Sequence, residues 1–415
     1  MSEWKRYKLG ELLRVKHGWA FKGEFFSDTG VQSILTPGNF YESGGFKANP
    51  SKDRFYSGDY PKEYLCSKGD LVVAMTEQAA GLLGSTAIVP EDNRYLHNQR
   101  IGLISCNESL NKYFAYYLFM TQSVRQQISR SASGTKVKHT SPEKIYDVQV
   151  DIPKIQTQKN IAFFLSSLDK KIQINNQINQ ELEAMAKTLY DYWFVQFDFP
   201  DQNGKPYKSS GGKMVYHPEL KREIPEGWGV EKLSSLLEIG RETINPMKTP
   251  KEEFKYYSIP EYDVSGSFSY ELGETIRSNK FIVEKSDLLV SKLNPWFNRV
   301  VYNLEENAIS STEFIVWKTF NRFEKNFLYQ VATSEEFIEY CTRFATGTSN
   351  SHKRVSPDIM VGFQIPFEKT YIQKFGEITD SIRTQVLQNN VQNQELTQLR
   401  DWLLPMLMNG QVKVE

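Results

Sequence analysis

The sequence contains few of the residues that build metal centres or disulfide frameworks. Its 415 residues include only three cysteines and five histidines. Cys66, Cys106 and Cys341 lie far apart, and an odd number of cysteines argues against a disulfide framework. We therefore expect reduced core cysteines in a cytoplasmic protein. The histidines show no metal-type spacing, which argues against a zinc site. They are His17, His97, His139, His217 and His352.

The chain also lacks a net charge and a long apolar segment. Its 50 basic residues balance its 50 acidic ones, so the total charge indicates neither a nucleic-acid partner nor a membrane surface. Any such partner must be bound by a local patch. No stretch approaches the ~18 apolar residues of a membrane span, and the N-terminus lacks the apolar region of a signal peptide. We therefore expect neither membrane insertion nor secretion.

Motifs of common enzymes are missing as well. There is neither a Gly-x-x-x-x-Gly-Lys phosphate loop nor a Gly-x-Gly-x-x-Gly turn, which argues against nucleotide-driven and dinucleotide-dependent chemistry. The tetrapeptide Asn-Pro-Trp-Phe at 294–297 is similar to the Asn-Pro-Pro-aromatic loop of amino-group DNA methyltransferases, but it lacks the second proline. We interpret it as a turn that presents Trp296. The sequence thus offers no catalytic residues.

What the sequence does contain is one long pattern stated twice. Both copies carry Gly-Thr-x-x-x-His, then Ile-Pro at the same distance, then Asn-Asn-x-x-Asn-Gln-Glu-Leu. The first copy begins at Trp4 and the second at Trp228. Solenoid repeats have periods of roughly 20–50 residues, so copies this far apart indicate a duplicated domain with a two-fold task. The matching tracts are Gly134-Thr135, His139 and Ile152-Pro153 in the first copy, and Gly347-Thr348, His352 and Ile365-Pro366 in the second.

Each copy changes its periodicity at the Ile-Pro pair. Before it, short apolar runs broken by turn residues predict a β-rich mixed domain with one helix, at 110–128 and 327–344. After it, residues at alternating steps of four and three predict a long helix with a coiled-coil face. Two such helices in one chain should pack on each other. Strands are expected at 70–75, 87–90, 287–290 and 314–317. The seam positions are Ile161, Leu165, Leu168, Ile172, Asn175, Asn179, Leu182, Ala186, Leu189 and Trp193, then Phe375, Thr379, Ile382, Val386, Asn389, Asn393, Leu396, Arg400, Leu403 and Leu407.

Asparagines interrupt both seams. A buried amide costs stability but rejects registers that leave it unpaired, so we predict that these residues set the coiled-coil register. They are Asn175, Asn179, Asn389 and Asn393. Between the copies, residues 197–227 are rich in turn signals, with a hairpin expected at Asn203-Gly204. The chain should therefore comprise a globular domain at 1–153, a helical region at 154–199, a linker at 200–225, a second globular domain at 226–366 and a second helical region at 367–415.

Local charge supplies the positive functional signal. Residues 125–142 and 343–357 carry several cations and no acid, and both surround Gly-Thr-x-x-x-His. Clustered cations with hydroxyls and amides on a loop suit phosphate contact and base-edge reading. The alternative is a solvated loop with cations near a helix C-terminus, and recurrence in both copies favours DNA. The candidate DNA-binding residues are Gln99, Arg100, Thr135, Lys136, Lys138 and His139 in the first domain, and Lys292, Trp296, Arg299, Ser349, Asn350, His352, Lys353 and Arg354 in the second.

Five short tracts follow one another along the chain in an order that is typical of one family. They are Leu9-Gly-Glu-Leu12, Gly134-Thr135 to Pro153, Leu189-Tyr-Asp-Tyr-Trp-Phe194, Ile224-Pro-Glu-Gly-Trp228 and Leu403-Leu-Pro-Met-Leu-Met-Asn-Gly410. Through them the whole chain resembles the DNA specificity subunit of a type I restriction-modification system. The resemblance and the heptads together imply an α+β fold. Two β-rich target-recognition domains would be joined by two long helices that form an intramolecular antiparallel coiled coil with pseudo-two-fold symmetry.

The resemblance also implies a chain without catalytic activity of its own. Each target-recognition domain would read one half of a bipartite, asymmetric site on double-stranded DNA, and the helices would set the spacer. Two adenine-N6 methyltransferase subunits, and usually two restriction-translocase subunits, would assemble on the chain in a bacterial or archaeal cytoplasm. Those partners, and not this chain, would use S-adenosylmethionine, ATP and Mg²⁺. A coiled-coil scaffold or protein-recognition module is the alternative, and an enzyme fused to a recognition domain is a weaker one.

Overall fold

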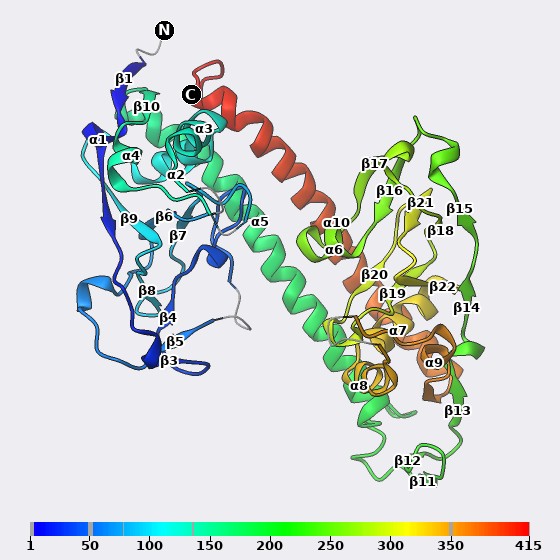
Figure 1. Ribbon diagram of the computed structural model, residues 1–415. Helices are drawn as coiled ribbons and strands as arrows, with labels where there is room; N and C mark the ends of the chain where they lie inside the picture. The colour runs from blue at the N-terminus through cyan, green and yellow to red at the C-terminus, as the bar shows by residue number, and fades with distance from the viewer. Residues whose placement is uncertain (1–3, 49–52, 78, 135–136, 348–351, 415) are drawn as a thin grey trace. The chain divides into compact units, whose positions relative to one another are not determined.

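The chain folds into two compact units whose boundaries lie within its two long helices. The structure is a computed structural model and describes residues 4–48, 53–77, 79–134, 137–347 and 352–414 (Figure 1). Unit 1 comprises Met1–Asn175 together with Val391–Glu415, and unit 2 comprises Asn176–Asn390. Each long helix therefore contributes one part to each unit.

Unit 1 is organised around a four-stranded antiparallel sheet of order β2-β9-β6-β7. All four side chains of β6 are buried, and β6 and β7 confirm the strands predicted at 70–75 and 87–90. A second sheet has the order β3-β5-β4-β8, and β1 forms a separate ladder with β10. The strands are β1 (Lys5–Lys8), β2 (Leu13–His17), β3 (Phe26–Ser27), β4 (Ser33–Ile34), β5 (Phe55–Tyr56), β6 (Leu71–Ala74), β7 (Thr86–Ile88), β8 (Tyr95–Leu96), β9 (Ile101–Cys106) and β10 (Gln149–Ile152).

Short helices complete unit 1, and one prediction needs correction there. The helix predicted at 110–128 is two helices, because Thr121 leaves the helical region (ψ 143°) after α2 and its hydroxyl caps α3 by accepting from Val124 N. Phe114 and Tyr117 of α2 are almost fully buried in the core. The helices are α1 (Leu9–Leu12), α2 (Lys112–Met120), α3 (Gln122–Ser131) and α4 (Pro142–Tyr146).

Unit 2 has a similar arrangement of strands and helices but a different amino-acid sequence. Its four-stranded sheet has the order β14-β22-β19-β20, a five-stranded sheet has the order β15-β18-β21-β16-β17, and β13 pairs with β23. The helix predicted at 327–344 again divides into two, here at the capping residue Ser334. The elements are β13 (Gly229–Lys232), β14 (Leu237–Gly240), β15 (Thr243–Ile244), β16 (Glu253–Tyr257), α6 (Ile259–Ser265), β17 (Ser269–Leu272), β18 (Lys280–Val283), β19 (Leu288–Ser291), β20 (Val300–Tyr302), β21 (Ala308–Ser310), β22 (Phe314–Thr319), α7 (Arg322–Thr333), α8 (Glu335–Phe344), α9 (Pro357–Val361) and β23 (Gln364–Phe367).

The linker predicted at 200–225, within the turn-rich segment 197–227, is folded onto unit 2. β11 (Met214–His217) and β12 (Arg222–Pro225) form an antiparallel hairpin. The predicted turn at Asn203-Gly204 is present: Asp201 N donates to Lys205 O at 2.8 Å, and Gly204 has a positive φ of 75°. Phe199 is 1% exposed and stacks on Trp228, with ring centroids 4.9 Å apart. Apolar burial therefore holds this segment in place.

The two long helices are α5 (Ile155–Tyr190) and α10 (Lys369–Met408). Every seam position predicted from the heptads is buried or half-buried. A π-helical turn, η5 (Asp191–Val195), extends α5 and buries Trp193 and Phe194 in unit 2. The α+β class is thereby confirmed.

The helices run antiparallel in both units and are joined by acid–base pairs. In unit 1, Arg400 Nη1 lies 2.8 Å from Asp169 Oδ1. In unit 2, Arg383 Nη1 lies 2.6 Å from Glu183 Oε1. The acids stand on α5 and the bases on α10, so each helix complements the other.

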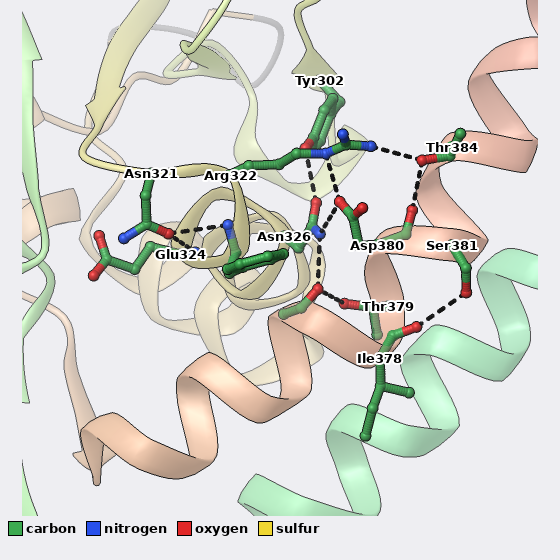
Figure 2. Close-up of polar contacts among 12 residues, drawn as sticks. Tyr302, Asn321, Arg322, Glu324, Asn326, Ile378, Thr379, Asp380, Ser381 and Thr384 are labelled. Atoms are coloured by element: carbon green, nitrogen blue, oxygen red, sulfur yellow. Dashed lines mark hydrogen bonds and ion pairs between the residues drawn. The ribbon is translucent and has the colours of Figure 1, made fainter.

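Unit 2 also fixes α7 against α10 through a polar network (Figure 2). Tyr302 Oη donates to Asn326 Oδ1 at 2.7 Å, and Asn326 Nδ2 donates to Gly376 O at 3.0 Å and to Asp380 Oδ1 at 3.2 Å. Arg322 forms an ion pair with the same Asp380 oxygen at 2.5 Å (Figure 2). Because these groups saturate one another, α7 can approach α10 closely.

Gly376 is the residue that permits this approach. A Cβ added there would lie 2.3 Å from Phe323 O and 2.6 Å from Phe323 Cβ. We expect Gly376→Ala to lower the urea-unfolding midpoint, because overpacking costs about 1–3 kcal/mol against a helix-propensity gain of about 1 kcal/mol. Gly229→Ala is the control, since its nearest neighbour would be 3.9 Å away. A midpoint at or above the wild-type value in Gly376→Ala would contradict this packing.

Candidate nucleic-acid interface

Three segments of unit 1 meet beyond one end of its four-stranded sheet. Met75 N, which follows β6, donates to Arg100 O at 2.9 Å, and Thr140 N donates to Met75 O at 3.0 Å. The side chain of Thr76 contacts His139, with 3.1 Å between Oγ1 and Nδ1. The chain around 98–100 and the basic loop around 138–140 are thereby held side by side by the sheet.

The predicted unit 1 residues at this end are exposed. They are Gln99, Arg100, Lys138 and His139. Lys138 Nζ lies 3.4 Å from Ser129 Oγ. Thr135 and Lys136, predicted with them, lie outside the described residues. Roles in DNA binding stay predictions for this set.

Trp19 is a candidate that the sequence reasoning missed. It follows β2 at the same end of the sheet, where its N–H donates to His97 O at 2.8 Å and its carbonyl accepts from Gln99 N at 3.1 Å. The ring is 41% exposed and lies 5.3 Å from that of Tyr64. An exposed tryptophan beside cations suits stacking or apolar contact with bases. The available signal was the His-Gly-Trp run at a strand end.

Unit 2 places the corresponding segments together in the same way. Lys292 N donates to Glu313 O at 2.9 Å, and Val355 N donates to Lys292 O at 3.1 Å. The backbone of Asn294 donates to Lys353 O at 2.7 Å, and its side-chain oxygen accepts from Lys353 N at 3.0 Å. Of the predicted set, Lys292 and Lys353 are half-buried and His352 is exposed. Ser349 and Asn350 lie outside the described residues.

The Asn-Pro-Trp-Phe tract forms the turn that was predicted for it. Pro295–Phe297 is a 3-10 turn, η9, flanked by Asn294 and Asn298 in the left-handed region with φ of 49° and 48°. Trp296 and Phe297 are 38% and 58% exposed. The turn therefore presents two aromatic rings next to the basic loop.

The two basic loops align differently in the structure than in the sequence, and the offset is two residues. Ser133 bridges His139 in unit 1, whereas Thr346 bridges Arg354 in unit 2, so the second loop is two residues longer. Arg354, and not His352, therefore occupies the place of His139. Likewise Glu313 occupies the place of Arg100, since both carbonyls accept from the residue that follows the third sheet strand. The histidines of the Gly-Thr-x-x-x-His repeat are therefore not structurally equivalent in the two units. Their matching spacing is coincidental.

Two predicted DNA-binding arginines have carboxylate partners. Arg354 Nη2 donates to Glu313 Oε1 at 2.9 Å and Nε donates to Oε2 at 2.9 Å, and this carboxylate raises the pKa of the arginine. Arg299 Nε and Nη2 donate to Asp263 at 2.5 and 2.7 Å. Its side chain is only 10% exposed and lies over the Phe297 ring at 4.6 Å. Arg299 is thus held between Asp263 and the aromatic turn, and its role in DNA binding stays a prediction.

Burial keeps two further basic side chains away from the protein surface. Arg125 donates to the carbonyls of Glu42 and Gly81, and burial lowers its pKa to about 10. Burial also lowers the pKa of His97 to about 4, so at neutral pH it is uncharged and its Nε2–H donates to Ile101 O at 2.8 Å. Both residues support loops.

The three cysteine thiols are weaker acids than an exposed cysteine. Cys66 and Cys341 are buried, Cys106 is half-buried, and burial raises their pKa values to about 12, 12 and 11. Among the residues that the structure describes, no three His, Cys, Asp or Glu side chains gather as metal ligands. Within the same residues, no helix is long and apolar enough to cross a membrane.

The seam asparagines form hydrogen bonds between α5 and α10. In unit 1, Asn175 Nδ2 donates to Asn393 Oδ1 at 2.9 Å and to Gln392 Oε1 at 2.8 Å. In unit 2, Asn389 Nδ2 donates to Asn179 Oδ1 at 2.8 Å, and Asn179 Nδ2 donates to Asn390 Oδ1 at 2.8 Å. The amides meet across the seam, and their role in setting the register stays a prediction.

Known proteins share this organisation. The family described as "Type I restriction modification DNA specificity domain" matches residues 1–184. The HindI specificity subunit of Haemophilus influenzae is 23% identical and aligns with 99% of this chain and 100% of its own. The MjaIX specificity subunit of Methanocaldococcus jannaschii is 23% identical over 73% of this chain and 69% of its own. A crystal structure of the type I restriction-modification S subunit from M. genitalium has a TM-score of 0.56 and 16% identity, covering 98% of this chain and 96% of that one.

Residues 1–184 match that family's model, and the chain is similar along its length to type I restriction-modification specificity subunits at 23% identity.

Paired amides predict a characteristic pattern of stability. Asn389→Leu should lower the free energy of unfolding by about 1–3 kcal/mol, because it removes the donor to the buried side-chain oxygen of Asn179. The double variant Asn179→Leu/Asn389→Leu should be more stable than that single variant, yet form additional oligomers, because apolar seams tolerate several registers.

The exposed Gln180→Leu serves as the control. Urea unfolding measures the stability, and light scattering after size exclusion measures the oligomers. A double variant as unstable as the sum of its singles, and still monodisperse, would show that the amides act independently.

Proposed function

We propose that this chain is the DNA-reading subunit of a type I restriction-modification complex, and that each unit reads one half of a bipartite, asymmetric site. One observation carries the proposal. The two units hold the same three backbone segments together at a sheet end, but they present different side chains there. A shared frame gives two comparable docking geometries on a duplex, and unlike side chains give two unlike half-sites.

Reading would use hydrogen bonds and apolar contacts to base edges. Arginine and lysine favour guanine edges, glutamine favours adenine, and apolar groups contact the thymine methyl. Unit 1 offers Gln99 and Arg100 with Trp19 beside them, and unit 2 offers Arg354 with the Trp296 turn. Exposed lysines such as Lys138 would contact phosphates, which fixes the protein's position without reading sequence.

The chemistry would belong to partner subunits. Two adenine-N6 methyltransferase subunits using S-adenosylmethionine, and two restriction-translocase subunits using ATP and Mg²⁺, would assemble on this chain in the cytoplasm. Large exposed apolar side chains on the long helices are candidate contacts for such partners. Phe163 and Trp402 in unit 1 are 76% and 63% exposed, and Met185 in unit 2 is 58% exposed.

Binding to duplex DNA tests the proposal directly. The full chain, with its methyltransferase subunits, should select one bipartite sequence from a random duplex pool. Its affinity should fall steeply as salt rises, because phosphate contacts release counterions. Weak binding that ignores sequence would contradict the proposal and would favour a protein-binding scaffold instead.

Lys138 should behave as a phosphate contact. We expect Lys138→Gln to weaken binding by a similar factor on cognate and unrelated duplexes, and to reduce the slope of log affinity against log salt by about one. Lys5→Gln, an exposed lysine on β1, should leave the slope unchanged. A change in sequence preference at one base pair would instead assign Lys138 to base reading.

The helices should act as a ruler for the unread spacer. We expect one heptad inserted before Asn179, with a second heptad inserted between Asn390 and Asn393 to preserve pairing, to lengthen the spacer and leave both half-sites unchanged. Seven residues add about 10 Å of helix, which corresponds to roughly three base pairs. Selection of bound duplexes measures both quantities, and altered half-site bases would contradict the division of roles.

A further inference from the structure

Two arginines beside the aromatic turn are each bound by a carboxylate, and they differ in how far they are exposed to solvent. Arg354, bound to Glu313, is 44% exposed, whereas Arg299, bound to Asp263, is 10% exposed. Both arginines donate through Nε and Nη2 to a single carboxylate. Arg299 is enclosed under Phe297, while Arg354 stands at the open end of the sheet.

The hydrogen-bond geometry leaves one edge of the Arg354 guanidinium available. Glu313 occupies the edge formed by Nε and Nη2. Among the described residues, Nη1 has only a 3.4 Å contact with the carbonyl of His352. A guanidinium carries five N–H donors in a planar fork. Its outer edge, formed by Nη1 and Nη2, can therefore still donate two parallel hydrogen bonds.

Stability alone gives little reason for this pair. Exposed ion pairs contribute little to stability because solvent screens them and ordering two side chains costs entropy. What Glu313 does provide is orientation, since a bidentate carboxylate fixes the plane of the guanidinium. Leu293 and Thr346 additionally bridge the backbone of Arg354 on both sides. The side chain is held ready before any ligand arrives.

Unit 1 has different residues at the same two backbone positions and lacks the acidic one. Arg100 stands where Glu313 stands, and His139 stands where Arg354 stands. The oriented arginine is therefore specific to unit 2, and only one half-site should depend on it.

We propose that Arg354, oriented by Glu313, reads a guanine in the half-site bound by unit 2, donating from its outer edge to O6 and N7. This inference rests on the proposed function and names the base class that one residue selects. Guanine is the base that offers two acceptors in the major groove at the spacing of a guanidinium fork. Lysine lacks that planar fork, so charge alone would not replace Arg354.

The test uses the full chain with its methyltransferase subunits and the duplex it selects. Each guanine is replaced in turn by 7-deazaguanine, which lacks the N7 acceptor, and affinity is measured at fixed salt by fluorescence anisotropy. For the wild type, one replacement in one half-site should weaken binding about tenfold or more. Arg354→Lys should lose most of that sensitivity, and Glu313→Gln should lose part of it. Arg222→Lys, which changes an arginine paired with Glu336 outside the proposed interface, is the control and should retain it.

The failures are distinguishable. A wild-type complex that selects no sequence contradicts the proposed function. A selected site whose guanines remain equally sensitive in Arg354→Lys overturns the assignment of Arg354 while leaving the proposed function intact. Half-sites without guanine overturn it as well. Sensitivity lost equally in Arg222→Lys would show that the effect reports the integrity of unit 2 and not base reading, and would also overturn it.

Discussion

The pairing of α5 with α10 is the interaction on which the rest of the structure depends. It brings the end of the chain back into unit 1, where Leu407 is 1% exposed and packs into the core with Leu9. Asp169–Arg400 and Glu183–Arg383 place acids on α5 and bases on α10, so a helix paired with its own copy would oppose like charges. A buried charge left without its partner is strongly destabilising, which favours this pairing over a helix paired with its own copy.

Duplication and divergence act on different layers of each unit. The sheet order, the capped helix pair and the long helices recur because each buries apolar side chains that few arrangements accommodate. The sheet ends are exposed and tolerate change. There, Arg100 with His139 in one unit is replaced by Glu313 with Arg354 in the other. A shared arrangement of sheets and helices with different side chains at the sheet ends is what recognition of two unlike half-sites requires.

Much of the fold follows from the sequence, whereas the site follows only in outline. The heptad seams and the buried strands are strongly periodic and were predicted. The breaks at Thr121 and Ser334 were missed because one capping hydroxyl interrupts an apolar period that continues through it. The support of Arg299 by Asp263 could not be predicted, because 36 residues separate them and only the folded chain brings them together. The two extra residues in the loop before Arg354 could not be recognised, because Gly-Thr-x-x-x-His has the same spacing in both copies.

The most direct measurement of the central claim is a map of methylated adenines in DNA from cells that contain this chain and the proposed methyltransferase subunits, obtained by single-molecule sequencing. The account predicts one bipartite, asymmetric motif with a fixed spacer, absent when the gene for this chain is deleted. It also predicts that exchanging the sheet-end residues of unit 2 changes one half of the motif and preserves the other. A motif that persists without this chain, or that changes in both halves at once, would contradict the account.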